Sequence, residues 1–211
     1  NLCNEQVALT SGGTQARYTL DGVVDTANSR KDNLEAMLSA MAGNLVYSGG
    51  EYFIRGAEYS SPTVVIDESV LSGGIEVQTK QSRRSLYNGV KGVFLSEDDN
   101  YTLADYPAQI SSSYSIEDGD PIYLDLAMPF TTNSARSQRI AKIALLRSRQ
   151  QTTINLPCNL TALKFKAGDN IMVTNSKMGW NQKVFEVIGY DFNLSSEGTI
   201  VVNVQAIETT A

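Results

Sequence analysis

The chain has 211 residues, 42% of them hydrophobic, with 17 lysines and arginines against 23 aspartates and glutamates and a formal net charge of −6. It contains no histidine, which excludes Ser-His-Asp and Cys-His catalysis and zinc sites that need imidazole. The acidic balance argues against a general duplex-DNA binder, because such proteins displace counterions with clustered lysine and arginine. Length and hydrophobic content fit one large domain or two small ones. No apolar run reaches the roughly 18 residues that a membrane span requires.

The N-terminal part of the sequence predicts a strand followed by an amphipathic helix. Residues 17–24 have the composition of a strand. Ser29 and Asp32 have capping-box-like spacing, and Gly43 is expected to end the helix that follows them. Apolar side chains recur at i, i+3, i+4 and i+7 across this segment, at Leu34, Met37, Leu38 and Met41.

A hairpin is expected directly after this helix. Residues 45–54 contain two short apolar runs around a Ser-Gly-Gly turn, and residues 63–66 are again extended in composition. The segment Leu71-Ser72-Gly73-Gly74 is the best candidate for a boundary. The sequence therefore divides into a part at 1–74 and a part at 75–211.

A second helix is predicted from Asn133, as the N-cap, to Gln150. One face of this helix is apolar, and its members are Ile140, Ile143, Ala144 and Leu146. Arg147 falls inside the apolar arc. A snorkelling or locally paired arginine is favoured there over a contact to a ligand or another subunit.

Four strands are expected after the second helix, at 152–156, 170–174, 183–192 and 199–204, with turns at 167–169 and 196–198. Short turns cannot make the crossovers of a parallel sheet, so a helix followed by such a meander indicates an α+β fold. The predicted fold class is α+β, mainly antiparallel β with two helices.

The stretch 96–120 is a long polar excursion with two acidic clusters, and excursions of that length are usually functional or disordered. Neither cluster has the ligand spacing of a calcium loop, so both are expected to be solvated. Cys3 and Cys158 are expected to be free thiols that act as small packing residues. No catalytic residue, metal or cofactor is predicted, and the protein is not expected to be an enzyme.

Aromatic and methionine side chains in loops are the candidates for a subunit interface, because tyrosine and tryptophan are enriched in buried protein contacts. The alternative for the single tryptophan is that it folds back on its own hairpin. With Arg147 added, the candidate interface residues are Met178, Trp180, Tyr101, Tyr106, Tyr114 and Arg147.

An ordered series of segments resembles one family over almost the whole chain. The segments include RYTLDGVV at 17–24, GNLVYSGG at 43–50, RRSLYNGVKG at 83–92, the block 126–157 and GWNQKVFEV at 179–187. The series resembles the central region of the tip attachment protein of long, flexible-tailed phages, the lambda protein J type. The chain begins without methionine, which suggests a piece of a longer polypeptide.

This resemblance implies a structural component of a phage or prophage tail tip. Such proteins form a trimeric hub that closes the distal end of the tail tube. The part at 1–74 would be a strand-helix-hairpin hub subdomain, and the part at 75–211 a tail-tube-like β-barrel or sandwich with a flanking helix. The implied partners are further copies of the chain, as a trimer in the full-length protein, and other tail proteins, with no membrane.

The implied location is the virion tail tip, and the host cytoplasm during assembly. Genome DNA would pass the hub without specific binding, and like-charge repulsion from acidic residues lining a lumen would suit that passage. A second function stays open, which is a carbohydrate-binding or hydrolytic β-module directed at the host surface.

Overall fold

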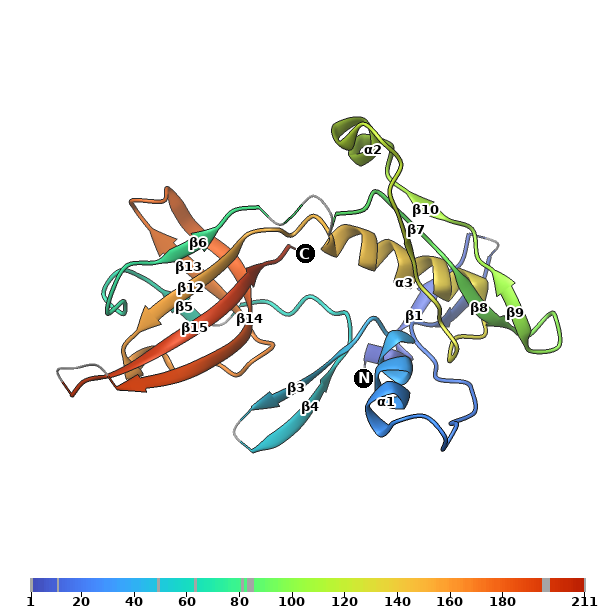
Figure 1. Cartoon of the computed structure of the whole chain (residues 1–211), viewed down its shortest axis with the longest axis horizontal. Helices are drawn as coiled ribbons and strands as arrows, with labels where there is room; N and C mark the ends of the chain where they lie inside the picture. Colours follow the sequence, from blue (N-terminus) through green and yellow to red (C-terminus); the bar gives the residue numbers. More distant parts are fainter. Residues whose placement is uncertain are drawn as a thin grey trace. The chain divides into compact units, whose positions relative to one another are not determined.

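The computed structural model describes residues 2–10, 12–48, 50–62, 64–80, 82, 86–194 and 198–210. The chain forms two compact units, each built from segments that are distant in sequence (Figure 1). The first unit comprises Asn1–Leu45, Ile54–Glu58 and Arg84–Arg149, and the second comprises Val46–Phe53, Tyr59–Arg83 and Gln150–Ala211.

The first unit combines short strands with the helices of the chain. Its strands are β1 (Gln6–Ala8), β2 (Thr14–Ala16), β7 (Gly89–Lys91), β8 (Val93–Ser96), β9 (Thr102–Asp105), β10 (Gln109–Ile110) and β11 (Tyr123–Asp125). Its helices are α1 (Arg30–Ser39), α2 (Ser112–Asp118) and α3 (Ser134–Arg147). β7 lies between β10, which is antiparallel to it, and β11, which is parallel. The buried core of this unit consists of Tyr18, Val90, Phe94, Tyr106, Met128, Ile140, Ala141 and Leu145.

Helix α1 begins as the sequence predicts. The side chain of Ser29 caps it by accepting a hydrogen bond from the backbone N–H of Asp32. The helix ends at Ser39 with Ala40 as its C-cap, so it stops before the predicted end at Gly43. The chain then reverses at Ala42, which has a left-handed φ of 45°. Gly43 serves a different purpose, because a Cβ there would lie 2.6 Å from the carbonyl oxygen of Arg55.

The strand predicted at 17–24 is wrong. This segment forms no strand, and its backbone groups bond instead to separate parts of the first unit, including Glu5 and Phe130. Arginines of α3 bind the carbonyls at its start. Nε of Arg136 donates to the carbonyl of Ala16 at 3.2 Å, and Nη1 of Arg139 donates to the carbonyl of Arg17 at 2.8 Å. Strand composition cannot report such long-range competition for the backbone.

Helix α3 confirms the predicted cap, since Asn133 accepts hydrogen bonds from the backbone N–H groups of Ala135 and Arg136. Its buried face is rotated from the predicted one. Leu145 is buried, whereas Leu146 is 48% exposed. Position 146 therefore lies at the margin of the apolar arc, where the neighbouring elements leave it uncovered.

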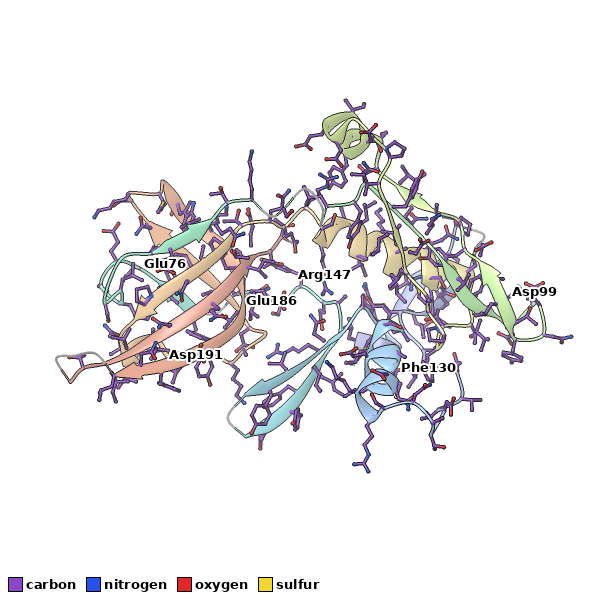
Figure 2. All side chains as sticks on the ribbon, in the orientation of Figure 1. Glu76, Asp99, Phe130, Arg147, Glu186 and Asp191 are labelled. Carbon is purple, nitrogen blue, oxygen red and sulfur yellow. The ribbon has the colours of Figure 1, made fainter. Side chains whose placement is uncertain are left out.

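The polar excursion at 96–120 is folded over its whole length. β8 and β9 form a hairpin, with Asp99 near its tip (Figure 2), and Asn100 and Tyr101 both adopt a left-handed φ in the turn. Helix α2 follows, capped by Ser111 at its start and by Gly119, with a left-handed φ of 86°, at its end. The sequence predicted two helices, and the described residues contain three α-helices.

The second unit is built on one six-stranded sheet. The strands are β5 (Val64–Ile66), β6 (Glu76–Gln78), β12 (Thr153–Cys158), β13 (Asn170–Asn175), β14 (Trp180–Leu194) and β15 (Ile200–Glu208), in the spatial order β5-β13-β14-β15-β12-β6. The pairs are antiparallel except β5 with β13. The two-stranded hairpin of β3 (Asn44–Ser48) and β4 (Glu51–Arg55) contributes residues to both units.

The four predicted strands form, and β13, β14 and β15 confirm an antiparallel meander, while β12 pairs antiparallel with β15 and not with β13. The fold class is α+β. Among the described residues the sheet stays open, since β5 and β6 are its two edges and do not pair with each other. Gly168, with a φ of 86°, forms the predicted turn before β13. Of the turn predicted at 196–198, residues 196 and 197 lie outside the described residues, as does Thr63 at the start of the extended segment 63–66.

The boundary expected between residues 74 and 75 falls within the second unit. β5 precedes this point and β6 follows it, yet the two strands form opposite edges of the same sheet. The short edge strands belong to the second unit. Residues 84–149 then belong to the first unit, and the remaining strands of the sheet follow after residue 149.

Cys158 is a fully buried packing residue in the core of the second unit. Burial raises the pKa of its thiol to about 11, so the reactive thiolate is scarce at neutral pH. We expect N-ethylmaleimide at pH 7.5 to leave Cys158 unmodified in the folded chain and to alkylate it in urea. Mass spectrometry of the peptide that contains residue 158 measures this. Rapid alkylation without urea would contradict the burial.

Candidate interaction surface

The six side chains predicted for a subunit interface lie in very different environments. Tyr101 is 59% exposed and Met178 is 45% exposed, so both are accessible on the surface of their units. Arg147 is locally paired, because its Nη1 donates to the carbonyl of Ala42 at 2.8 Å. Figure 2 shows Arg147 on the last turn of α3.

Tyr106 is a core residue and not a surface anchor. It is 3% exposed, and its hydroxyl donates to the carbonyl of Leu126 at 3.0 Å. Burial raises the pKa of its phenol to about 12, and the charge of Asp125 adds to this rise. The sequence placed Tyr106 in a polar stretch, and only the pairing of β8 with β9 brings it into the core.

Replacing Tyr106 by phenylalanine should destabilise the first unit by about 0.5–1.5 kcal/mol at neutral pH, the usual contribution of one hydrogen bond. The phenol of Tyr106 holds its proton more tightly in the folded chain than in the unfolded chain, where its pKa is near 10. Its contribution to the free energy of unfolding is therefore complete below pH 10 and is lost as the pH rises toward 12. Thermal melting between pH 8 and 11 should therefore show a steeper loss above pH 10 for the wild type than for Tyr106→Phe. Parallel pH profiles would contradict this assignment.

Tyr114 belongs to a buried polar network between α2 and the end of α3. The guanidinium of Arg149 lies 4.4 Å from the centre of the Tyr114 ring and forms a bidentate pair with Asp118, at 3.1 and 2.5 Å. Asn88, which is fully buried, donates to the same carboxylate at 3.0 Å and accepts from the N–H of Ile122 at 2.9 Å. This network holds the excursion against α3.

Trp180 is the first residue of β14 and packs on its own sheet. Its ring lies 5.3 Å from the ring of Phe185, and the ammonium of Lys183 lies 5.5 Å from each of the two rings. Lys183 also pairs with Glu208 at 2.9 Å. The geometry thus corresponds to the alternative in which the tryptophan folds back on its own hairpin.

One exposed apolar feature of the second unit was not identified from the sequence. β13 pairs with β14 only from Trp180 to Glu186, and a bulge follows between Val187 and Gly189. Beyond the bulge, β14 and β15 continue to pair with each other, while β12 still flanks β15 as far as Val202. We call the end of these two strands, residues 191–194 of β14 and 200–202 of β15, the arm. The arm pairs Phe192 with Val202 and Leu194 with Ile200.

One face of the arm continues the core face of the sheet into solvent. Val202 is buried, but Phe192, Leu194 and Ile200 on the same face are 54%, 73% and 43% exposed. Tyr190 links the two regions, since its ring makes edge contacts to the buried Phe165 and to Phe192. Exposed apolar patches of this kind mark interaction sites in soluble proteins.

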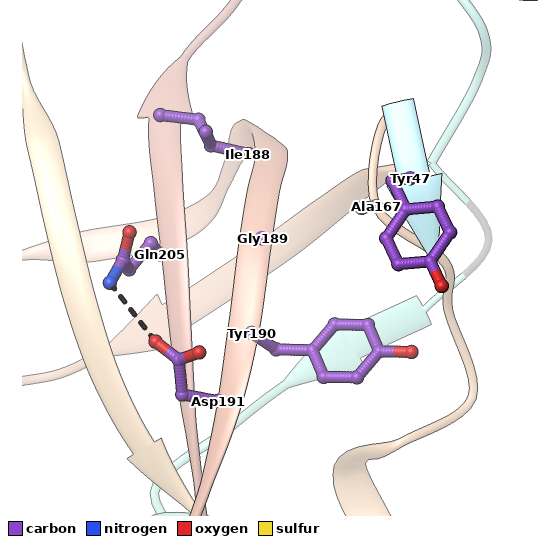
Figure 3. A pocket seen from close by; sticks show the side chains of 7 residues that line it. All are labelled: Tyr47, Ala167, Ile188, Gly189, Tyr190, Asp191 and Gln205. Atoms are coloured by element: carbon purple, nitrogen blue, oxygen red, sulfur yellow. Dashed lines mark hydrogen bonds between the residues drawn. The ribbon is translucent and has the colours of Figure 1, made fainter. Parts of the chain in front are cut away.

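A pocket of about 300 Å³ opens beside the bulge (Figure 3). The rings of Tyr47 and Tyr190 lie on one side of β14, and Asp191 and Gln205 lie on the other, where the amide of Gln205 donates to Asp191 at 3.5 Å. Its full lining is Tyr47, Ala167, Ile188, Gly189, Tyr190, Asp191 and Gln205.

Several carboxylates that contribute to the net negative charge are paired. Glu5 pairs with Arg17 at 2.7 Å, and the hydrogen bond from that guanidinium lowers the pKa of Glu5. Asp118 and Glu208 are paired as described above. The prediction that acidic residues line the lumen of a tail hub remains a prediction.

The described part of the chain contains no group of three or more cysteine, aspartate or glutamate side chains arranged to hold a metal ion. Within the same residues, no helix combines the length and apolar character needed to cross a membrane.

No protein-family model matches this sequence, and no curated protein matches it significantly. Solved structures do match. A chain in the virion of a native gene transfer agent particle aligns with 94% of this chain and 42% of its own length, with a TM-score of 0.71 and 11% identity. The tail protein from Neisseria meningitidis MC58 aligns with 88% of this chain and 57% of its own length, with a TM-score of 0.63 and 14% identity.

A third match is the 43 kDa tail protein of prophage MuSo2 from Shewanella oneidensis. It aligns with 88% of this chain and 56% of its own length, with a TM-score of 0.53 and 12% identity. The chain thus spans about half the length of these proteins. At these identities the likeness shows a shared fold, and that fold is found in a virion particle, in a tail protein and in a prophage tail protein.

Proposed function

We propose that the chain is a structural part of a phage-type tail and acts through protein–protein contacts. The observation that carries this proposal is the fold, which aligns over 94% of the chain with a protein of a virion particle. Two tail proteins from different bacteria also align over 88% of the chain. The likeness extends over both compact units. It is therefore more specific than a match to a single sheet, which many unrelated proteins share.

Within the tail, we assign the chain to the tip hub, where it serves host attachment and DNA delivery. The resemblance of its segments to the lambda protein J type supports this position. A trimer in the full-length protein follows from the same resemblance, with other tail proteins as further partners and no enzymatic activity. The exposed apolar arm supports a role in contacts, since it leaves the core face of the sheet uncovered.

Deleting these 211 residues in frame from the gene tests this function. Particles from the deletion strain should lack complete tails in negative-stain electron micrographs, and a plasmid copy of the gene should restore them. Complete, infective tails in the deletion strain would contradict the proposal.

The pocket beside the bulge favours one second candidate, a carbohydrate-binding β-module. The tyrosine rings offer a stacking surface for a sugar, and Asp191 and Gln205, across β14 from them, offer hydrogen-bonding groups for hydroxyls. Binding on a glycan array that is lost in Asp191→Ala would support this candidate over the tail role. Release of reducing ends from host polysaccharide would support the hydrolytic form. We favour the tail role, because the fold comparison covers both units whereas the pocket concerns one.

A further inference from the structure

We propose that the arm is a site of strand pairing between copies of this chain, with the β14 edge of one copy joined to the β15 edge of the next. This inference rests on the proposed function, since it names the partner through which the tail subunit associates. The segments concerned are residues 191–194 of β14 and residues 200–201 of β15.

The first argument is the uncovered edge of β14. Its neighbour β13 ends its pairing at Glu186, and the backbone of Val187 is still bonded to the turn before β13, at Gly168 and Asp169. Among the described residues, no strand other than β15 pairs with residues 191–194. A strand edge of this kind is a template for an extended chain, because its backbone groups alternate at the spacing of a β-ladder.

The second argument is that the same arm has an uncovered edge on its other side. β12 pairs with β15 only as far as Val202, opposite Cys158. Ile200 and Val201 therefore have β14 as their one strand neighbour within the described residues. Two different edges on opposite sides of one arm are what a head-to-tail contact requires, because each copy then supplies one edge and receives the other.

The third argument is the side-chain pattern. Phe192, Leu194 and Ile200 lie on one face of the arm, so arms joined in this way would form a continuous apolar stripe. Asp191 and Asn193 alternate with these residues and point to the opposite face. A partner that bonds to this backbone edge must itself be a strand, with apolar side chains on one face only. The arm of a second copy is such a strand.

Sedimentation equilibrium and amide hydrogen exchange of the 211-residue chain test the proposal together. We expect the weight-average mass to rise with concentration, and the amides of 191–194 and 200–201 to gain protection over the same range. The double variant Phe192→Lys/Leu194→Lys should weaken association at least tenfold, because charges would replace the apolar stripe. A matched control, Ile116→Lys, changes a residue that is 83% exposed on α2 and should associate like the wild type.

Circular dichroism of both variants confirms that they are folded, since all three positions are exposed. A chain that stays monomeric at every concentration would overturn the proposal, as would association that the arm variant leaves unchanged. Protection of the arm that requires another tail protein, and not a second copy, would also overturn it. These outcomes differ from failure of the tail function, because particles can depend on the 211 residues while the arm makes no contact between copies.

Discussion

Replacing Arg149 by methionine should destabilise the first unit by about 3–5 kcal/mol, the usual cost of leaving one partner of a buried ion pair alone. The side chains of Arg149 and Asp118 are only 12% and 10% exposed. Without the guanidinium, the carboxylate keeps the hydrogen bond from Asn88 but loses its charge partner. Helix α2 should therefore detach from α3, and its amides should exchange faster with solvent.

Hydrogen exchange of the amides in α2, α3 and β7 measures the loss in the first unit. The double variant Arg149→Met/Asp118→Leu should recover much of the stability, because it removes both charges together. Lys142→Met on the exposed side of α3 is the matched control and should change the stability little. A loss below about 1 kcal/mol for Arg149→Met would show that the network does not hold the excursion.

Replacing Phe185 by alanine should destabilise the second unit by about 3–5 kcal/mol, as for other fully buried phenylalanines. Phe185 has no exposed surface, lies at the centre of β14 and packs against the ring of Trp180. Truncation leaves a cavity between the sheet and its covering side chains, and it also removes the ring on which Trp180 rests.

Phe192→Ala provides the control on the same strand, since Phe192 is 54% exposed. Truncation at this position should cost less than about 1 kcal/mol, because most of the ring is already in water. Hydrogen exchange of β13, β14 and β15 gives both values. Equal losses for the two variants would mean that Phe192 contributes as much to the core as Phe185 does.

Local signals in the sequence predicted the elements that local chemistry determines. The caps Ser29 and Asn133 form as expected, because an N-cap depends on a hydroxyl or amide and the next three residues. The four strands of the second half also form, since their alternating side chains have one buried face. The short connection between β13 and β14, with Gly179 in a left-handed conformation, allows only antiparallel pairing of these two strands.

Contacts between distant residues determine the parts that the sequence did not predict. Residues 17–24 have strand composition, but arginines 120 and 122 positions away bind the carbonyls of Ala16 and Arg17. The interleaved units depend on two three-residue edge strands, β5 and β6, which are too short for a periodic signal. Helix α2 has only seven residues and no buried one, so no apolar stripe marked it.

The six residues predicted for an interface differ in exposure, and their role in an interface stays a prediction. Tyr101 and Met178 are exposed as an interface residue must be, whereas Tyr106 lies in the core because strand pairing buries it. The arm was missed, although Phe192 and Leu194 alternate with the polar residues Asp191 and Asn193 before the turn predicted at 196–198. That β14 and β15 extend beyond the strands that flank them depends on the register of the sheet, which a single sequence does not reveal.

The central claim is that this chain is a structural subunit of a tail, and electron cryomicroscopy of intact particles from the source that encodes it tests this most directly. We expect density at the distal end of the tail into which both compact units fit, in three copies around the axis. Antibodies against the chain should label the same end. Density without this fold at any level of the tail, together with particles that lack the chain by mass spectrometry, would contradict the account.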